Sequence, residues 1–167
     1  PLVTDDPAQI GVVDAVLVCT KTFQVAPALE DYSSSLIGPD TVVVTTQNGV
    51  ATPQVVADIV GRRRTCPGVC REWVKIVEPG LVDDMGGPAS IHIGMLDGSQ
   101  NPIVDEIRSR FESVGVTCPP VDDIITELWF KAVNVCAQGA IGAALEATLG
   151  ELLTCHRDLF VRCVREW

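Results

Sequence analysis

The sequence predicts an α/β fold, in which a doubly wound sheet is followed by a helical region. Over the first half of the chain, short apolar runs rich in β-branched residues alternate with helix-like segments. This order is typical of a largely parallel sheet with helices on both faces. After Asp122 the sequence contains neither a strand pattern nor a proline. We therefore expect a sheet domain over residues 1–120 and a helical domain over residues 121–167.

The first half contains two expected strand–helix units. In chain order, we expect a strand over 14–20, a helix over 27–37, a strand over 41–46 and a helix over 53–60. Both strands are continuous apolar runs, as in parallel strands that are covered on both faces. Pro27 is expected to open the first helix and Gly38-Pro39 to end it, whereas Gly61 follows the second.

The alternation of strand-like and helix-like segments ends after Arg64. Strand-like runs between Arg64 and Gly94 are separated by Pro79-Gly80 and Gly86-Gly87-Pro88, which predicts short strands near a sheet edge. A helix over 101–113 and a short strand over 115–119 are expected to complete the sheet. In the helical region that follows, we expect breaks at three glycines, namely Gly139, Gly142 and Gly150.

Composition excludes several classes of function. The chain is 47% hydrophobic, and its 12 Lys+Arg against 22 Asp+Glu give a net charge of −10, which disfavours a nucleic-acid partner. No uninterrupted apolar run reaches the ~18 residues of a membrane helix, so we expect a cytoplasmic protein without a membrane segment. The seven cysteines lack zinc-site spacing and mostly lie in apolar runs, which predicts buried, reduced thiols and no metal site.

Polar side chains follow both apolar strands. Lys21 comes after the first strand, and Gln47-Asn48-Gly49 comes after the second. Ligands of open parallel sheets bind beyond the carboxyl ends of the strands, so Lys21 and Asn48 are candidate ligand-binding residues. The alternative is that Asn-Gly forms an ordinary turn and that the lysine is merely solvated.

A polar stripe runs along the helix that begins near Asp122. At about 100° per residue, one face of this otherwise apolar helix collects Glu127, Lys131, Asn134 and Gln138. Such a stripe suits a polar cleft, in which a desolvated lysine acquires a lowered pKa and can protonate a developing alkoxide. The alternative is a solvent-exposed seam with an i,i+4 pair between Glu127 and Lys131.

Three motifs, in this order and spacing, resemble the ketopantoate reductase (2-dehydropantoate 2-reductase) family. They are AVLVCTK at 15–21, VVVTTQNG at 42–49 and the E-L-W-x-K core at 127–131. The resemblance implies the second half of a Rossmann-type, NADPH-binding domain over 1–120 and the start of an all-helical substrate domain over 121–167. It places the glycine-rich cofactor loop before Pro1 and further substrate contacts after Trp167, so the chain alone is expected to be inactive.

The resemblance also implies roles for individual residues. Lys21, Asn48 and the backbone at Val74 would contact the cofactor. Lys131 would be the general acid, and Asn48 would also contact the substrate. From the amide stripe itself, we expect Asn134 and Gln138 to bind the substrate together with Asn48.

The family usually has asparagines four and eight residues after the lysine. Here those positions are Val135 and Gly139, and amides occur one residue earlier. The implied reaction is NADPH-dependent reduction of a small 2-keto acid. The expected substrate is ketopantoate, which is reduced to pantoate in pantothenate and coenzyme A biosynthesis. A homodimer is the expected assembly. The alternatives are a non-catalytic dinucleotide sensor and a reductase of another keto or imino acid.

Overall fold

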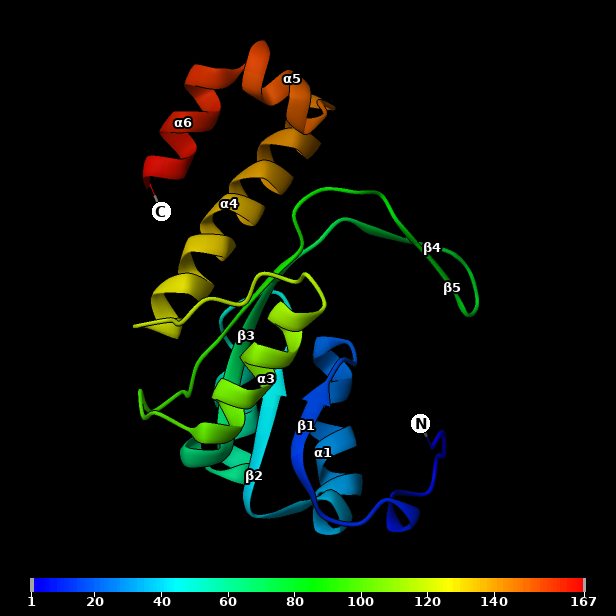
Figure 1. Cartoon of the computed structure of the whole chain (residues 1–167). Helices are drawn as coiled ribbons and strands as arrows, with labels where there is room; N and C mark the ends of the chain where they lie inside the picture. Colours follow the sequence, from blue (N-terminus) through cyan, green and yellow to red (C-terminus); the bar gives the residue numbers. More distant parts are fainter. Residues whose placement is uncertain (1, 167) are drawn as a thin grey trace.

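A four-stranded sheet forms the centre of the computed structural model, which describes residues 2–166 (Figure 1). The strands β1 (Val13–Val18), β2 (Ile37–Thr45) and β3 (Thr65–Arg71) run parallel, and β6 (Ser90–Ile93) pairs antiparallel with β3. The strand order is β1-β2-β3-β6. The parallel strands thus present their carboxyl ends along one edge of the sheet.

Helices cover both faces of this sheet. On one face, α1 (Thr22–Leu36) and α2 (Thr52–Val60) share an apolar core with Val43 of β2. On the other face, α3 (Pro102–Ser113) contributes Val104 to a second core, which contains the flanking Val42 and Val44. Because adjacent residues of β2 enter opposite cores, the predicted doubly wound arrangement is confirmed.

The strands after Arg64 lie near a sheet edge, as predicted. Two further strands pair in a sheet of their own, β6 is an edge strand, and β3 lies between β6 and β2. Gly68 makes this packing possible, because a Cβ there would lie 2.6 Å from the carbonyl oxygen of Thr45. The expected strand over 115–119 is reduced to a single bridge between Ser90 and Thr117.

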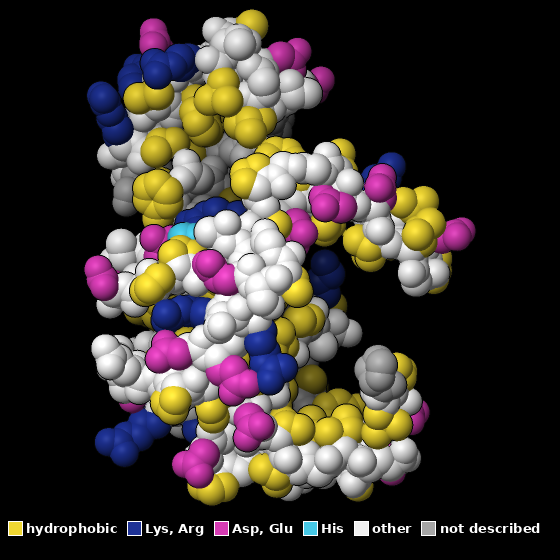
Figure 2. Space-filling view, in the orientation of Figure 1, with side chains coloured by type: hydrophobic (Ala, Val, Ile, Leu, Met, Phe, Trp, Pro, Cys, Tyr) yellow, Lys and Arg dark blue, Asp and Glu magenta, His cyan; other side chains and the backbone are white. Residues whose placement is uncertain are grey.

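A separate two-stranded hairpin projects from the body of the molecule (Figure 1). It consists of β4 (Val74–Glu78) and β5 (Leu81–Asp84), all of whose residues are exposed. Figure 2 shows hydrophobic side chains on this hairpin and on the helical part of the chain. Two short 3₁₀ turns, η1 (Pro7–Gln9) and η2 (Arg62–Arg64), lie before β1 and β3.

The first helix starts earlier than predicted. It begins at Thr22, so Pro27 lies inside it and does not open it. The Gln24 side chain accepts a hydrogen bond from the Lys21 backbone N–H, which caps the helix one turn before the proline. The helix ends at Leu36, and Gly38-Pro39 belongs to β2.

The C-terminal region is helical, as predicted, but its break is elsewhere. Its helices are α4 (Ile124–Leu145), α5 (Leu149–Thr154) and α6 (Arg157–Glu166). Among these described residues, α4 continues through Gly139 and Gly142, and Gly150 lies within α5. The chain turns instead at Glu146, whose φ is 52°. Trp167 lies outside the described residues.

The helix α4 is apolar over most of its surface but only partly buried. Its buried residues are Ile124, Leu128, Ala137 and Ile141, whereas Phe130 is 65% exposed. Ile124 and Leu128 form a small core with Val69 of β3, so the helical region is anchored to the sheet at its start. The domain boundary at residues 120 and 121 remains a prediction.

By length and composition, α4 is also the one helix among residues 2–166 that could cross a membrane. We expected no such segment, because no uninterrupted apolar run is long enough. An 18-residue window of α4 nevertheless reaches a mean hydropathy of 1.2, because an average can stay high even when the window contains one or two charged residues. Since Ile124 and Leu128 of the same helix pack on β3, this composition is weak evidence for a membrane span.

Candidate functional site

The Gln47 side chain links the loops after β1 and β2 through hydrogen bonds. Its amide nitrogen donates hydrogen bonds to the carbonyl oxygens of Val18, at 2.7 Å, and Thr20, at 2.8 Å. Its amide oxygen accepts from the Thr46 backbone N–H at 3.2 Å. Gln47 is therefore fully occupied by the backbone, and the neighbouring Asn48 is left exposed at the carboxyl edge of the sheet.

Asn48 and Lys131 line the same pocket, which has a volume of about 190 Å³. Asn48 comes from the loop after β2, and Lys131 comes from the second turn of α4. The other lining residues are Gln47, Gly49, Gly68, Val69, Leu128, Ala132, Val135 and Cys136. The fold thus brings together two of the residues that the sequence predicts for the site.

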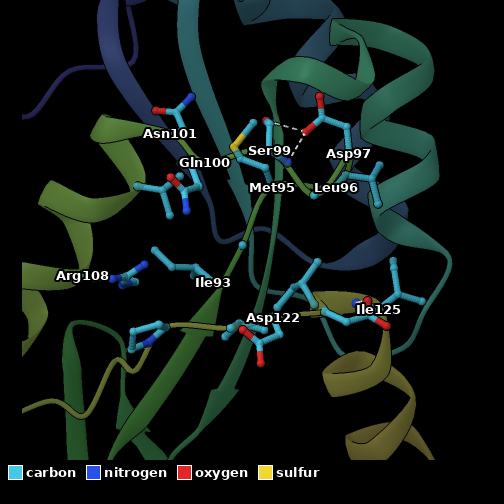
Figure 3. A pocket seen from close by; sticks show the side chains of 17 residues that line it. Ile93, Met95, Leu96, Asp97, Ser99, Gln100, Asn101, Arg108, Asp122 and Ile125 are labelled. Carbon is cyan, nitrogen blue, oxygen red and sulfur yellow. Dashed lines mark hydrogen bonds between the residues drawn. The ribbon is translucent and has the colours of Figure 1, made fainter.

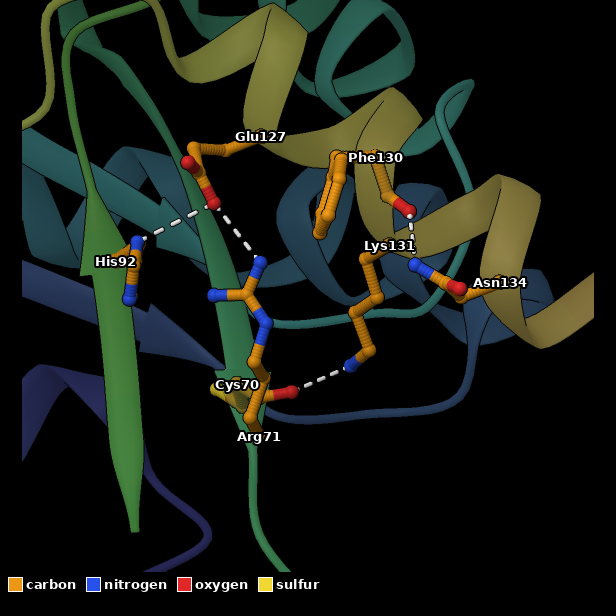
Figure 4. Close-up of polar contacts among 7 residues, drawn as sticks. All are labelled: Cys70, Arg71, His92, Glu127, Phe130, Lys131 and Asn134. Carbon is orange, nitrogen blue, oxygen red and sulfur yellow. Dashed lines mark hydrogen bonds and ion pairs between the residues drawn. The ribbon is translucent and has the colours of Figure 1, made fainter. Parts of the chain in front are cut away.

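Lys131 is half-buried beside the end of β3 (Figure 4). Its ammonium donates a hydrogen bond to the carbonyl oxygen of Cys70. Burial lowers the pKa of Lys131, and the positive charge of Arg71 lowers it further. An ammonium with a lowered pKa releases its proton more readily, which suits a proton donor.

Glu127, one turn before Lys131, takes part in a charged cluster. Its carboxylate lies 2.8 Å from the Arg71 guanidinium and 3.3 Å from Nδ1 of His92 (Figure 4). The expected alternative, a Glu127–Lys131 pair, is therefore not what the structure has. His92 of β6 faces Glu127, and its side chain is 20% exposed. Burial and the Arg71 charge lower the pKa of His92.

The two remaining amides of the stripe lie away from this pocket. The Asn134 side chain donates to the carbonyl oxygen of Phe130, one turn earlier in its own helix, at 3.0 Å. Gln138 lines an adjacent hollow together with Gly139 and Leu149. Val135, four residues after Lys131, lines both spaces. Substrate contacts of Asn134 and Gln138 remain predictions.

The two other predicted cofactor contacts are exposed. Lys21 lies three residues after the end of β1 and is the N-cap residue of α1, next to Thr20, whose carbonyl oxygen accepts a hydrogen bond from Gln47. Among residues 2–166 no carboxylate forms an ion pair with it. Val74 starts β4 on the projecting hairpin and is 51% exposed. Because Lys21 is exposed and forms no ion pair among residues 2–166, its ammonium can bind an anionic group at the carboxyl edge of the sheet.

A second pocket of about 440 Å³ contains none of the predicted site residues (Figure 3). It lies between the loop that follows β6 and the segment that precedes α4. Arg108 and Asp122 line it, and Nε of Arg108 is buried without a hydrogen-bond partner among the described residues. Its mixture of acidic, basic and amide groups indicates no single chemistry.

The cysteines are more varied than predicted. Cys66 and Cys118 are buried, and burial raises the pKa of Cys66 to about 12. Cys19, Cys136 and Cys155 are exposed, so the expectation of uniformly buried thiols is wrong for these three. All seven are free, and the described residues contain no group of three potential metal ligands.

Comparison with known proteins identifies the family. The family described as "Ketopantoate reductase PanE/ApbA" matches residues 1–98, more than half of the chain. The chain belongs to this family. Its sheet is therefore part of a Rossmann-type fold, as the sequence resemblance implied.

Individual relatives agree with this assignment. The chain is 28% identical to the 2-dehydropantoate 2-reductase of Pyrococcus horikoshii over 139 residues, which cover 83% of this chain and 44% of that protein. The crystal structure of 2-dehydropantoate 2-reductase from Geobacter metallireducens GS-15 is 29% identical, with a TM-score of 0.80, and the match covers 95% of this chain and 52% of that one. The chain spans about half the length of the curated relatives it matches.

A D-mandelate dehydrogenase in complex with NADH has the same fold. The TM-score is 0.74 at 22% identity, and the match covers 84% of this chain and 46% of that one. At this identity the likeness extends to the fold alone.

Proposed function

We propose that the full-length protein reduces a small 2-keto acid with NADPH, and that Lys131 donates the proton to the new hydroxyl. The observation that carries the proposal is the shared pocket of Lys131 and Asn48. One wall comes from the carboxyl edge of the sheet and the other from α4, so a molecule held between them meets an ammonium and an amide together. The names of the relatives nominate 2-dehydropantoate as the first substrate to assay.

The residues of this edge fit an anionic dinucleotide. Lys21 presents an exposed ammonium after β1, and Asn48 presents an exposed amide after the neighbouring β2. We propose that Lys21 meets a phosphate or ribose, and that Asn48 lies between cofactor and substrate. The backbone at Val74 is a third proposed contact. A bound nicotinamide would supply the hydride.

Lys131 completes the proton balance of this reaction. Reduction adds one hydride to the keto carbon and one proton to the keto oxygen, which converts the 2-keto acid into a 2-hydroxy acid. The Lys131 ammonium gives up that proton as the carbon–oxygen double bond is reduced. Its lowered pKa eases the transfer, and the positive charge that it carries beforehand stabilises the growing negative charge on oxygen.

NADPH oxidation by the full-length protein with a panel of 2-keto acids tests the proposal. Absorbance of the reduced cofactor is followed, and NADPH and NADH binding are measured in parallel by fluorescence. We expect turnover with at least one 2-keto acid and tighter binding of NADPH than of NADH. Lys21→Met is expected to weaken NADPH binding. Binding without turnover of any keto or imino acid would instead support a non-catalytic dinucleotide sensor.

The remaining parts of the proposal concern the whole protein. We propose that the full-length protein acts in the cytoplasm. In it, residues 1–120 would form part of the cofactor domain, and residues 121–167 would form part of the substrate domain. A homodimer is testable by light scattering.

A further inference from the structure

Three consecutive arginines lie where the parallel strands of the sheet begin, at its lower end in Figure 1. They form η2 (Arg62–Arg64), which links α2 to β3, and the chain turns into η2 at Gly61, whose φ is 90°. Lys131 lies at the other end of β3, where it contacts the carbonyl oxygen of Cys70. The arginines are therefore separate from the pocket of the proposed reaction.

The arginines line a cavity of about 660 Å³, which we call the arginine pocket. Its other walls are the start of β2, the end of α2 and the start of α3. The lining residues there are Pro39, Asp40, Val60, Gly61, Asn101, Pro102 and Ile103. Val60 belongs to one core of the sheet and Ile103 packs against the other, so packing within this chain fixes these walls. The volume lies in the range of pockets that hold small molecules.

Backbone carbonyl groups hold two of the three guanidinium groups in place. Arg64 donates from Nε to the carbonyl oxygen of Pro39 and from Nη1 to that of Val60, both at 3.1 Å. Arg62 donates from Nη2 to the carbonyl oxygen of Leu96 at 3.1 Å. A guanidinium has more N–H donors than these bonds use, so both groups keep donors for a ligand. Because they are already fixed, they lose less conformational entropy when a ligand binds.

The positive charge of η2 is not neutralised by ion pairs. Within residues 2–166, no carboxylate forms an ion pair with any of its three arginines. The charge of Arg63 still acts on Asp97, whose pKa is lowered by hydrogen bonds from Ser99 and further by Arg63. Asp40 is the one carboxylate among the described residues that line the pocket. Positive charge is thus in excess here, in a chain whose net charge is −10.

The start of α3 adds to this positive potential. The helix has 12 residues, and the N–H groups at the start of a helix carry partial positive charge and bind phosphate and other anions. Asn101, its N-cap residue, accepts a hydrogen bond from the Ile103 backbone N–H at 2.9 Å through its side-chain oxygen. The amide nitrogen of Asn101 is therefore a further donor at this wall.

We propose that the arginine pocket binds a small molecule that carries a phosphate or diphosphate group. Phosphate oxygens accept paired N–H bonds from a guanidinium, and their negative charge balances the excess positive charge of the pocket. The cavity is larger than a phosphate ion, which leaves room for an organic part of the ligand. This site goes beyond the proposed function and does not rest on it, because neither Lys131 nor the proposed cofactor contacts take part.

Calorimetric titration of the full-length protein with inorganic pyrophosphate tests the site. The titration is made in a buffer free of divalent cations, once without NADPH and once with NADPH in excess. Arg63→Met is the informative variant, because it removes one positive charge and none of the hydrogen bonds that hold the loop. Arg110→Met is the matched control, since it removes the same charge from an exposed position on α3. Arg63→Lys keeps the charge but loses the planar donor group.

We expect pyrophosphate to bind under both conditions, and Arg63→Met to raise its dissociation constant roughly tenfold or more. Arg63→Lys should have a smaller effect, and Arg110→Met should have none. The urea unfolding transition of Arg63→Met should be unchanged. Three results each overturn the inference. They are no binding of pyrophosphate, complete displacement of pyrophosphate by NADPH, and equal weakening by Arg63→Met and Arg110→Met.

Discussion

The Arg71 guanidinium and the Glu127 carboxylate form an ion pair, 2.8 Å apart, that joins the end of β3 to the first turn of α4. Both side chains are about one-third exposed, and His92 of β6 approaches the same carboxylate. The pair fixes the helix that carries Lys131 against the strand whose Cys70 carbonyl the lysine contacts. It also holds a positive charge close to the Lys131 ammonium.

Removal of the Arg71 charge should move the pH dependence of turnover. A lysine that acts as an acid must be protonated, so activity falls as the pH rises through its pKa. Arg71 contributes to the lowered pKa of Lys131, after burial. In Arg71→Met we therefore expect the alkaline limb of the kcat profile to shift to higher pH. Arg110→Met, which breaks an exposed pair with Glu106, serves as the control. A limb that stays in place, or shifts to lower pH, contradicts the role assigned to Arg71.

Thiol reactivity should separate the cysteines by position. The exposed thiols of Cys19, Cys136 and Cys155 should react with iodoacetamide in the native chain. Cys66 should not react until the chain unfolds, because burial shields the thiol and raises its pKa to about 12. Mass spectrometry of peptides from native and denatured samples measures this order. Rapid labelling of Cys66 in the native chain would contradict its burial in the core around β3.

Two glycine-to-alanine substitutions should change stability in opposite directions. In Gly68→Ala the new Cβ would lie 2.6 Å from the Thr45 carbonyl oxygen, so β2 and β3 must separate, at a cost of about 1–3 kcal/mol. Gly139 lies inside α4 with open space around its Cβ position, and alanine there should stabilise the helix by about 1 kcal/mol. Urea unfolding of both variants provides the free energies. Equal effects of the two substitutions would refute the packing at Gly68.

The strands of the first half were predictable because their signal is local. The apolar runs before Lys21 and Gln47 identify two buried strands, and the carboxyl-edge rule then places Lys21 and Asn48 at one end of the sheet. The start of α1 was missed because its capping contact involves Gln24, which is no strong signal in a sequence. Pro27 therefore dominated the prediction, although a helix that begins earlier can contain it.

The contacts across the site depend on residues far apart in the chain. Helical periodicity predicted that Lys131 shares a face with Glu127, but it could not show that Arg71 takes the glutamate and leaves the lysine to Cys70. The same periodicity collected Asn134 with Lys131, although a side chain that bonds to its own helix is withdrawn from the pocket. The turn at Glu146 is a local feature by contrast, closed by a hydrogen bond of 2.9 Å from the Ala147 backbone N–H to the Gly142 carbonyl oxygen. It was missed because Glu146 adopts a positive φ that usually favours glycine, and the nearby glycines drew the prediction.

The most direct test of the account is the turnover of Lys131→Ala in the full-length protein with NADPH and its best 2-keto acid, beside Arg110→Ala as a surface control. Loss of a general acid predicts that kcat falls by roughly 10²- to 10⁴-fold, with NADPH binding and the unfolding transition unchanged. A kcat equal to that of the unsubstituted protein would contradict the central claim that Lys131 supplies the proton.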